Sequence, residues 1–308
     1  MTSPAPLRIG TRGSPLALAQ AEEVKTRLIA AFPEMVTAAE IVIIKTTGDM
    51  ILDRALAEVG GKGLFTKEID DAMLDGRIDL AVHSMKDVPT WLPDGIVLPC
   101  MLEREDPRDA FISDKAKNIA DLPSGSVIGT AALRRQALIL NMRPDLKVVT
   151  FRGNVQSRLR KLAEGQVDAT LLALAGLNRL GNADVATSII ETNEMLPAVA
   201  QGAIGITCHT DDERAHKFLA ALNHQPTVFR VRAERALLEV LDGSCRTPIA
   251  ALAEIDTSDG LSLRGLIAKP DGSEVLETGR SGDMADAVAL GREAGEELKE
   301  RAGPGFLE

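Results

Sequence analysis

Two short passages recur in the same order along this chain of 308 residues, and they limit the folds open to it. Ile-Gly-Thr stands at 9–11 and again at 128–130, each time at the end of an apolar stretch and just before a helix-like one. Residues 74–82 and 163–171 share a second pattern, the end of a helix, a glycine cap and an apolar strand. The repeat predicts two related α/β lobes, and its unequal spacing indicates that they have diverged.

The C-terminal part of the chain, from about Pro226, has a different pattern. A helical stretch at 227–241 precedes short strand-like runs at 249–255, 261–269 and 274–278. Turn sequences at 258–260 and 270–272 join these runs, and a last helix is expected over 284–301. Since 308 residues are too many for one small core, we expect an α/β fold of two lobes with a smaller C-terminal α+β domain.

The composition limits the cellular compartments and the classes of binding partner that fit this chain. No apolar run approaches the length of a membrane span, and the N-terminus lacks a basic segment followed by an apolar one. The net charge is −10, with seven Phe, one Trp and no Tyr, so the chain has neither a broad basic face nor many stacking residues for nucleic acid. We expect a cytoplasmic protein that binds neither nucleic acid nor membrane.

Three cysteines lie far apart with no Cys-x-x-Cys pair, which disfavours both a disulfide framework and a metal site. Cys100 and Cys208 lie in or beside apolar runs and are expected to be small buried residues. Cys245 instead follows Gly243 in a loop and precedes Arg246, a cation that favours the thiolate. On residue chemistry alone, a nucleophile and an exposed thiol in a turn are equally good interpretations of Cys245.

Arginines gather where two predicted helices begin, although the chain as a whole is acidic. Arg134 and Arg135 follow the strand that ends at 128–130, and Arg152 and Arg158 flank the next helix start. A helix N-terminus and guanidinium groups aimed at one place suit a small ligand with several carboxylates or phosphates. The alternative for any single arginine is that it only solvates a helix or pairs with a surface acid.

A third set of polar residues follows the apolar strand at 79–82. His83, Ser84, Lys86 and Asp87 come where the carboxyl end of a strand lines the ligand crevice of an open α/β sheet. Asp87 beside cations should stay ionised and could stabilise positive charge on a ligand. The alternatives are a simple Asp-x-Pro turn for Asp87 and a buried core residue for His83. Residues 60–68 lack the phosphate-loop spacing, so we expect a flexible lid that carries Lys62.

Taken together, these segments closely resemble one family, porphobilinogen deaminase, over essentially the whole chain. The matching motifs are RIGTRGSPLA at 8–17, GGKGLF at 60–65, AVHSMKD at 81–87, REDPRDA at 104–110, LRRQ at 133–136, RGNV at 152–155, AGLNRL at 175–180, LPAVAQG at 196–202 and GSC at 243–245. The resemblance implies a transferase that joins four porphobilinogen molecules on a covalent dipyrromethane primer and releases hydroxymethylbilane, acting as a monomer. It also implies two lobes of the periplasmic-binding-protein type, 1–102 plus about 203–220 and 107–197, with a C-terminal α+β domain at 225–308 that carries the cofactor cysteine.

The resemblance also implies a role for each matched residue. Cys245 would hold the dipyrromethane through a thioether, and Asp87 would be the catalytic carboxylate. The residues that would bind the cofactor are Ser84, Lys86, Asp87, Thr130, Arg134, Arg135 and Arg158. Those that would bind substrate are Arg12, Ser14, Gln20, Lys62, Arg152, Arg158 and Arg179, with Asp49 nearby.

The chain departs from the family pattern at a few positions. Ala131 and Ala132 stand where many members have hydroxyl residues, and Glu58 stands where some have lysine. Each lost hydroxyl donor should weaken carboxylate binding by about 1 kcal/mol unless water replaces it. A two-lobed binding protein for dicarboxylates would share the lobes and arginines, but it would usually carry an export signal and has no need of the loop at Cys245.

Overall fold

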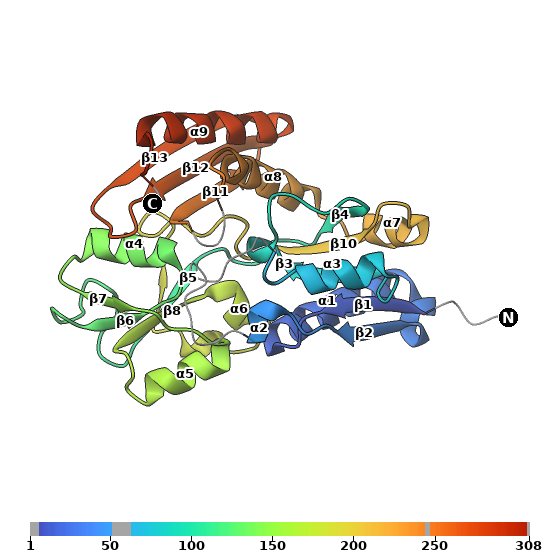
Figure 1. Ribbon diagram of the computed structural model, residues 1–308, viewed down its shortest axis with the longest axis horizontal. Coiled ribbons are helices and arrows are strands. Elements are labelled where there is room, and N and C mark those ends of the chain that lie inside the picture. Colours follow the sequence, from blue (N-terminus) through green and yellow to red (C-terminus); the bar gives the residue numbers. More distant parts are fainter. Residues whose placement is uncertain (1–5, 51–62, 244–246, 307–308) are drawn as a thin grey trace. The chain divides into compact units, whose positions relative to one another are not determined.

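The structure is a computed structural model that describes residues 6–50, 63–243 and 247–306. The strands in these ranges form three sheets, drawn in Figure 1. The described chain divides into two compact units, one made of residues up to 50, 63–105 and 203–228, and the other of 106–202 and 229–306. The first unit holds one sheet, and the second unit holds the other two.

The sheet of the first unit has the strand order β2-β1-β3-β10-β4. Strands β1, β2 and β3 are parallel, whereas β10 runs antiparallel between β3 and β4. The strands are β1 (Leu7–Thr11), β2 (Ala39–Ile43), β3 (Leu80–Ser84), β4 (Ile96–Met101) and β10 (Ile204–His209). Strand β10 returns more than 100 residues after β4, so the first lobe is completed by a late segment of the chain.

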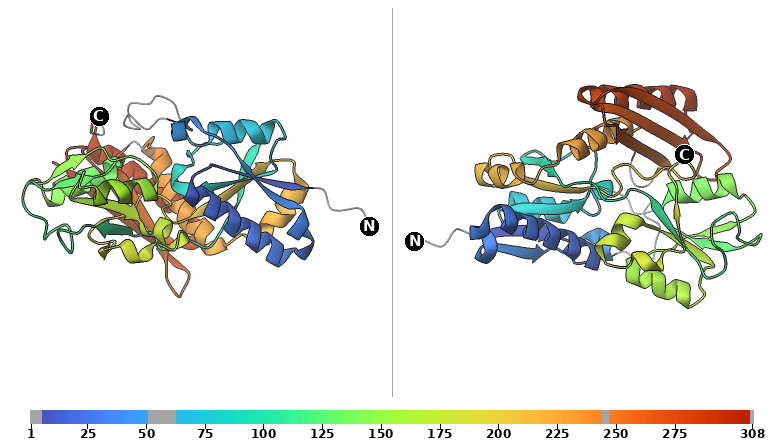
Figure 2. Two further views of the ribbon diagram at one scale, coloured as in Figure 1. Left: turned by 90° about the horizontal axis from the view of Figure 1, so that it is seen from below. Right: turned by 180° about the vertical axis from the view of Figure 1, so that it is seen from behind.

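Helices cover both faces of this sheet because its side chains alternate between two apolar clusters. Leu80 and Val82 pack with helix α1 and helix α7, whereas Ala81 packs with helix α3. Figure 2, left, shows α1 and α3 on opposite faces. The bounds are α1 (Pro15–Ala31), η1 (Pro33–Thr37), α2 (Thr47–Met50), α3 (Lys67–Leu74), η2 (Met85–Asp87) and α7 (Glu213–Ala220).

The second sheet repeats the same pattern with the order β7-β6-β8-β5-β9, in which β5 is the antiparallel strand. Its strands are β5 (Asp109–Ile112), β6 (Val127–Gly129), β7 (Lys147–Val149), β8 (Ala169–Ala173) and β9 (Ser188–Ile190). Its helices are α4 (Leu133–Met142), α5 (Val155–Ala163), α6 (Leu174–Arg179) and η3 (Ala183–Val185). The duplication predicted from the sequence is confirmed. Each lobe's antiparallel strand, however, lies at a different point of the chain.

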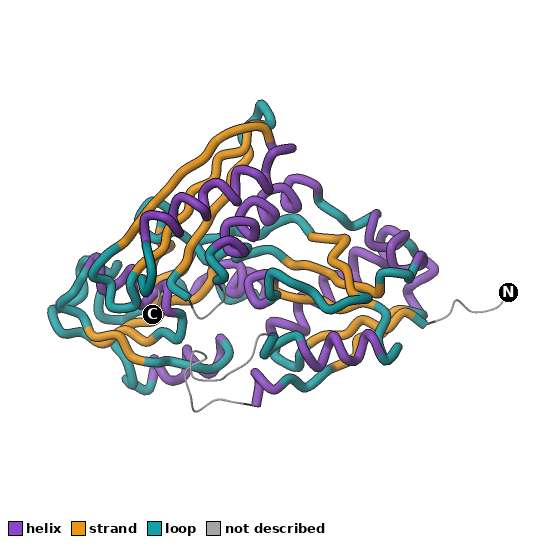
Figure 3. Tube along the Cα trace, turned by 45° about the horizontal axis from the view of Figure 1, so that its top comes forward, coloured by secondary structure: helices purple, strands orange, loops and turns teal. Residues whose placement is uncertain are grey.

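The C-terminal part is the predicted α+β module, an antiparallel sheet β11-β12-β13 with helix α9 along it, as Figure 3 shows. Its elements are α8 (Gln225–Val240), β11 (Ile249–Ile255), β12 (Gly260–Ala268), β13 (Val275–Asp283), η4 (Met284–Asp286) and α9 (Ala287–Ala302). Strand β13 extends five residues beyond the predicted end at 278, so that prediction was wrong. The polar, glycine-containing residues 279–283 do not resemble a strand, but each pairs with a residue of β12 in the ladder from Arg264 back to Gly260.

The described chain contains no helix that combines the length and apolar character needed to cross a bilayer.

Gly129, in the repeated Ile-Gly-Thr motif, is required by a close approach. A Cβ atom at Gly129 would lie 2.6 Å from Cγ of Phe151, a ring carbon that cannot move aside cheaply. Phe151 is buried, and its backbone N–H donates to the carbonyl of Thr130, so the ring is held beside the end of β6. The glycine of the second Ile-Gly-Thr passage is therefore needed for tight packing against Phe151.

We predict that Gly129→Ala lowers the free energy of unfolding by about 1–3 kcal/mol, because the added methyl overpacks the contact with Phe151. Urea denaturation followed by circular dichroism measures the change. Gly279→Ala on β13 is the matched control, since its Cβ meets its nearest neighbour at an ordinary 3.7 Å. Equal stability of the two variants would contradict the packing argument.

Candidate functional site

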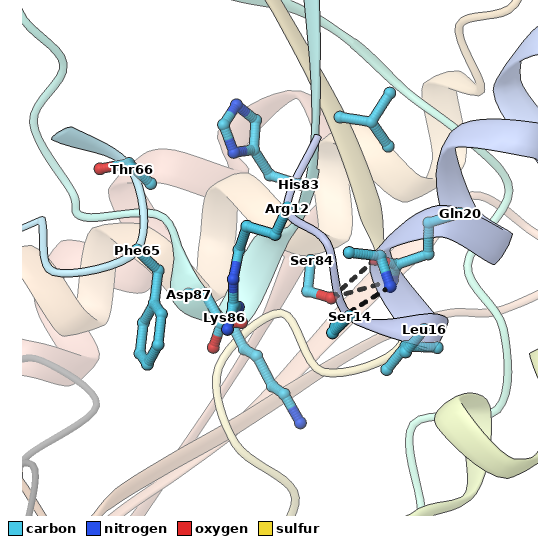
Figure 4. A pocket seen from close by; sticks show the side chains of 12 residues that line it. Arg12, Ser14, Leu16, Gln20, Phe65, Thr66, His83, Ser84, Lys86 and Asp87 are labelled. Carbon is cyan, nitrogen blue, oxygen red and sulfur yellow. Dashed lines mark hydrogen bonds and ion pairs between the residues drawn. The ribbon is translucent and has the colours of Figure 1, made fainter. Parts of the chain in front are cut away.

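A pocket in the first lobe gathers polar side chains from the ends of two parallel strands. Arg12, Ser14 and Gln20 come from the passage between β1 and α1, and His83, Ser84, Lys86 and Asp87 come from the end of β3 and from η2. Phe65 and Thr66, just before α3, complete the polar and aromatic wall. Figure 4 shows these side chains around the pocket. The strand-end geometry expected from the sequence brings them together.

Asp87 is the carboxylate of this pocket and lies beside Arg12. Nη1 of Arg12 is 3.5 Å from Oδ2 of Asp87, and the Arg12 guanidinium also stacks on the Phe65 ring at 4.2 Å from its centroid. The Asp87 side chain is 28% exposed and that of Arg12 is 22% exposed. Both charges are therefore partly screened by solvent and accessible to a ligand. Because the ion pair is long and partly solvated, replacing it with a contact to a ligand costs little free energy.

The other wall of the pocket is held by hydrogen bonds between α1 and β3. Nε2 of Gln20 and Oγ of Ser84 are 2.9 Å apart, and Gln20 is buried. Oγ of Ser14 caps α1 by accepting from the backbone N–H of Ala17 at 3.3 Å. These contacts fix the directions of Ser14 and Ser84 before a ligand arrives.

His83 lines the pocket but is largely buried, and it stays neutral at neutral pH. Its Nε2 lies 3.0 Å from Oγ1 of Thr207 on β10. Burial, with a smaller contribution from the charge of Arg12, lowers the pKa of His83 to about 4. The interpretation of His83 as a buried core residue is supported, and a side-chain hydroxyl is the partner of its Nε2.

The second lobe places Arg134 and Arg135 in its interior, not at its surface. Both are about 95% buried, and both pair with Asp109 at the start of β5, whose side chain is fully buried. Burial alone would raise the pKa of Asp109, but the charges of the two arginines hold it well below its usual range. Asp109 was not among the predicted site residues. An acid at the first position of a short apolar strand is the feature that could have identified it.

Arg158 lies one helical turn into α5, among other cations. Its Nε donates to the carbonyl of Gly153 at 2.9 Å, and no carboxylate in the described ranges pairs with it. Burial first, and then the charges of Arg135 and Arg152, lower the pKa of Arg158 to about 10, so it remains a cation at neutral pH. Like charges held together in this way favour an anionic ligand.

Two further predicted residues of this lobe have backbone partners. Nη2 of Arg179 donates to the carbonyl of Gly202 at 3.0 Å, and Oγ1 of buried Thr130 accepts from the N–H of Ala132 at 3.2 Å. Ala132 is the N-cap of α4, and no side chain caps this helix. The alanine at this position therefore leaves the start of α4 without a hydroxyl acceptor.

Some predicted residues lie outside the described ranges, namely Cys245, Lys62 and Glu58, and the side chain of Asp49 is also not described. The other two cysteines are buried, as predicted, and burial raises the pKa of Cys100 to about 12 and that of Cys208 to about 11. Burial therefore disfavours the thiolate form of both cysteines, which is the nucleophilic form. In the described part of the chain, no three His, Cys, Asp or Glu side chains are grouped to hold a metal ion.

Comparison with known proteins gives consistent matches along the chain. The family model "Porphobilinogen deaminase, dipyromethane cofactor binding domain" matches residues 7–217, and "Porphobilinogen deaminase, C-terminal domain" matches 228–300. A porphobilinogen deaminase of rice, named chloroplastic, is 63% identical over 98% of this chain and 86% of its own length. A porphobilinogen deaminase of Paracoccus denitrificans is 56% identical over 98% of this chain and 96% of its own length. Among solved structures, a periplasmic substrate-binding protein from Coxiella burnetii aligns with 72% of this chain and 93% of its own, at 16% identity and a TM-score of 0.44.

We predict that His83 makes stability depend on pH. The ring of His83 is protonated near pH 6.5 in the unfolded chain but only near pH 4 in the folded protein. The free energy of unfolding is therefore highest above pH 6.5, as far as His83 contributes, and it decreases as the pH falls toward 4. The loss should be on the order of 3 kcal/mol, by the pKa difference. Urea denaturation from pH 7 to pH 4 should show this loss in the parent protein and a shallower slope in His83→Gln. Parallel slopes would show that His83 is not the titrating group.

Proposed function

We propose a role for each residue of the site on one premise, which is that this chain belongs to the porphobilinogen deaminase family. The protein is a hydroxymethylbilane synthase, a transferase of tetrapyrrole biosynthesis. It deaminates four porphobilinogen molecules, joins them head to tail on a covalent dipyrromethane primer and releases hydroxymethylbilane by hydrolysis.

The position of Asp87 is the observation that best supports the assignment of roles to these residues. Among the described residues that line the first-lobe pocket it is the sole carboxylate, and the cations Arg12 and Lys86 line the same pocket. Loss of ammonia from porphobilinogen leaves positive charge on its pyrrole nitrogen, while its acetate and propionate groups carry negative charge. A carboxylate between cations suits both parts of that ligand.

The residues of the second lobe fit the carboxylates of the dipyrromethane. Arg158 is a cation without a carboxylate partner in the described ranges, close enough to Arg135 and Arg152 for their charges to lower its pKa. When bound, the dipyrromethane supplies the free α-carbon of its terminal pyrrole as the nucleophile. The residues that we propose to hold it are Cys245, Ser84, Lys86, Asp87, Thr130, Arg134, Arg135 and Arg158.

The chain's own residues then perform two tasks. Asp87 accepts hydrogen bonds from pyrrole N–H groups and stabilises the charge that develops on them, because a fixed carboxylate needs no reorganisation during the reaction. The substrate's side groups are held by Arg12, Ser14, Gln20, Lys62, Arg152, Arg158 and Arg179. These contacts orient the ring without touching the reacting carbon.

We also propose a cytoplasmic monomer that acts on a small molecule and uses neither nucleic acid nor membrane. The net charge of −10 supports the absence of nucleic acid. The rice relative is named chloroplastic, so cell fractionation decides the compartment, and sedimentation velocity decides the oligomeric state. The proposed functional domains are 1–102 with about 203–220, 107–197 and 225–308.

We predict that Cys245→Ser gives a folded protein without the mass of a dipyrrole and without bilane production, because a hydroxyl does not form the thioether. Intact mass spectrometry of the purified protein measures the attachment. Cys100→Ala is the control, since Cys100 is buried in the first lobe and should leave the added mass in place. Added mass on Cys245→Ser would disprove the anchor.

We predict that Asp87→Asn preserves folding and cofactor mass but lowers turnover on the order of 10²–10³-fold, because the charge is lost while the size is kept. The Michaelis constant should change less, since the interaction strengthens as charge develops. Asp87→Glu should retain more activity than Asp87→Asn.

Single-turnover bilane formation measures this effect, with circular dichroism and intact mass as checks on folding and loading. The exposed Asp94 of the same lobe gives a matched control, Asp94→Asn, which should turn over normally. Near-normal turnover of a folded, loaded Asp87→Asn protein would leave Asp87 as a turn residue.

A further inference from the structure

Asp109 is a buried charge for which the proposed mechanism has no use. Its side chain has no exposed surface, and it stands at the first residue of β5, which lies between β8 and β9. It therefore cannot touch a ligand without a rearrangement of the lobe. A buried carboxylate is costly unless its charge and lone pairs are satisfied, so its partners indicate its role.

The partners of Asp109 are donors from two places far apart in the sequence. Arg135 donates to both carboxylate oxygens of Asp109, from Nη2 to Oδ1 at 2.8 Å and from Nε to Oδ2 at 3.3 Å. Arg134 donates from Nη2 to Oδ2 at 2.7 Å. Nε2 of buried Gln201 donates to Oδ1 at 2.8 Å and to the carbonyl of Pro107 at 2.7 Å. One carboxylate thus joins the start of α4 to the segment between β9 and β10.

The same contacts determine where the two guanidinium groups point. Nη1 of Arg135 donates to the carbonyl of Leu171 at 2.8 Å, and Nη1 of Arg134 donates to that of Leu196 at 2.8 Å. Together with the contacts to Asp109, these bonds leave each planar group little freedom to rotate. Two adjacent buried cations repel each other, and their attraction to the negative charge of Asp109 offsets most of that repulsion. The group of two arginines and one aspartate keeps one net positive charge, which can attract an anionic ligand.

Arg134 also has a donor that no group among the described residues satisfies. Its Nε is buried in a residue that is only 4% exposed, and no atom in residues 6–50, 63–243 and 247–306 accepts a hydrogen bond from it. Buried donors without partners are rare in folded proteins. An arginine held firmly with one buried donor unused has capacity for another acceptor, and a ligand carboxylate is such an acceptor.

We propose that Asp109 is a positioning residue for the dipyrromethane, which it does not touch. Its carboxylate holds Arg134 and Arg135 in one geometry, so that their remaining N–H groups meet the primer's carboxylates without a further ordering cost. The proposal rests on the assignment of these two arginines to the cofactor.

The experiment compares cofactor loading in variants that share one chemical change. Asp109→Asn removes the charge at constant size, and Asp168→Asn is the matched control in the same lobe. Asp168 contacts the N–H of Val127 and Lys115, not the arginine pair. Apoprotein made in cells without porphobilinogen is given porphobilinogen, and intact mass follows the gain of the dipyrrole. Thermal unfolding is then measured for the apo and loaded forms.

If Asp109 positions the arginines, Asp109→Asn should load at least tenfold more slowly than Asp168→Asn. The rise in melting temperature on loading should also shrink, because that rise reports how well the folded protein binds the cofactor. A purely structural carboxylate would lower both melting temperatures equally and leave the rise and the loading rate unchanged, which would overturn the proposal.

Two further variants complete the test. Gln201→Met keeps the carboxylate and removes one of its donors, so it should load several-fold more slowly even if Asp109→Asn does not fold, and normal loading there would count against the proposal. Arg135→Gln tests the underlying assignment. If Arg135→Gln loads normally, the cofactor assignment itself fails. If it loads poorly while Asp109→Asn and Gln201→Met load normally, only the positioning role is wrong.

Discussion

The architecture depends on one antiparallel strand in the interior of each five-stranded sheet. Strand β10 completes the first sheet although it follows the second lobe in sequence, and β5 completes the second sheet although it precedes the rest of that lobe. Each sheet would otherwise lose a central strand and both of its ladders. Because hydrogen-bonded strands cannot be left unpaired in a core, the chain has to pass between the lobes twice.

The common direction of the parallel strands explains where the polar side chains of the site lie. In each lobe the parallel strands end on one edge of the sheet, where the next helix or turn begins, and the polar residues of the site follow these strand ends. Asp87 follows β3, Arg12 follows β1, and the arginine pair follows β6. The repeated Ile-Gly-Thr passages are the same structural position in two lobes, used for different side chains.

The two lobes handle their charges in different ways. In the first lobe, Arg12 and Asp87 are partly solvated and 3.5 Å apart, a weak pairing that leaves the carboxylate accessible to a ligand. In the second lobe, Arg134 and Arg135 are buried on Asp109, and Arg158 remains cationic without a carboxylate among the described residues. The cations of this acidic protein are thus concentrated at one kind of strand end, an arrangement that suits a ligand with several carboxylates.

The sequence by itself determined the two lobes, the C-terminal module, the buried Cys100 and Cys208, and the cluster at 83–87, because periodicity, glycine caps and strand ends are local properties. It also led, through resemblance, to the family. The roles of Cys245 and Lys62, outside the described residues, stay predictions.

Only the tertiary structure decided that β13 reaches Asp283, since a polar edge segment becomes a strand when β12 offers partners. The same holds for Asp109, whose arginine partners are 25 and 26 residues away, and for His83, whose hydroxyl partner is 124 residues away. Burial and pairing over such separations depend on which strands become neighbours, and no local pattern records that.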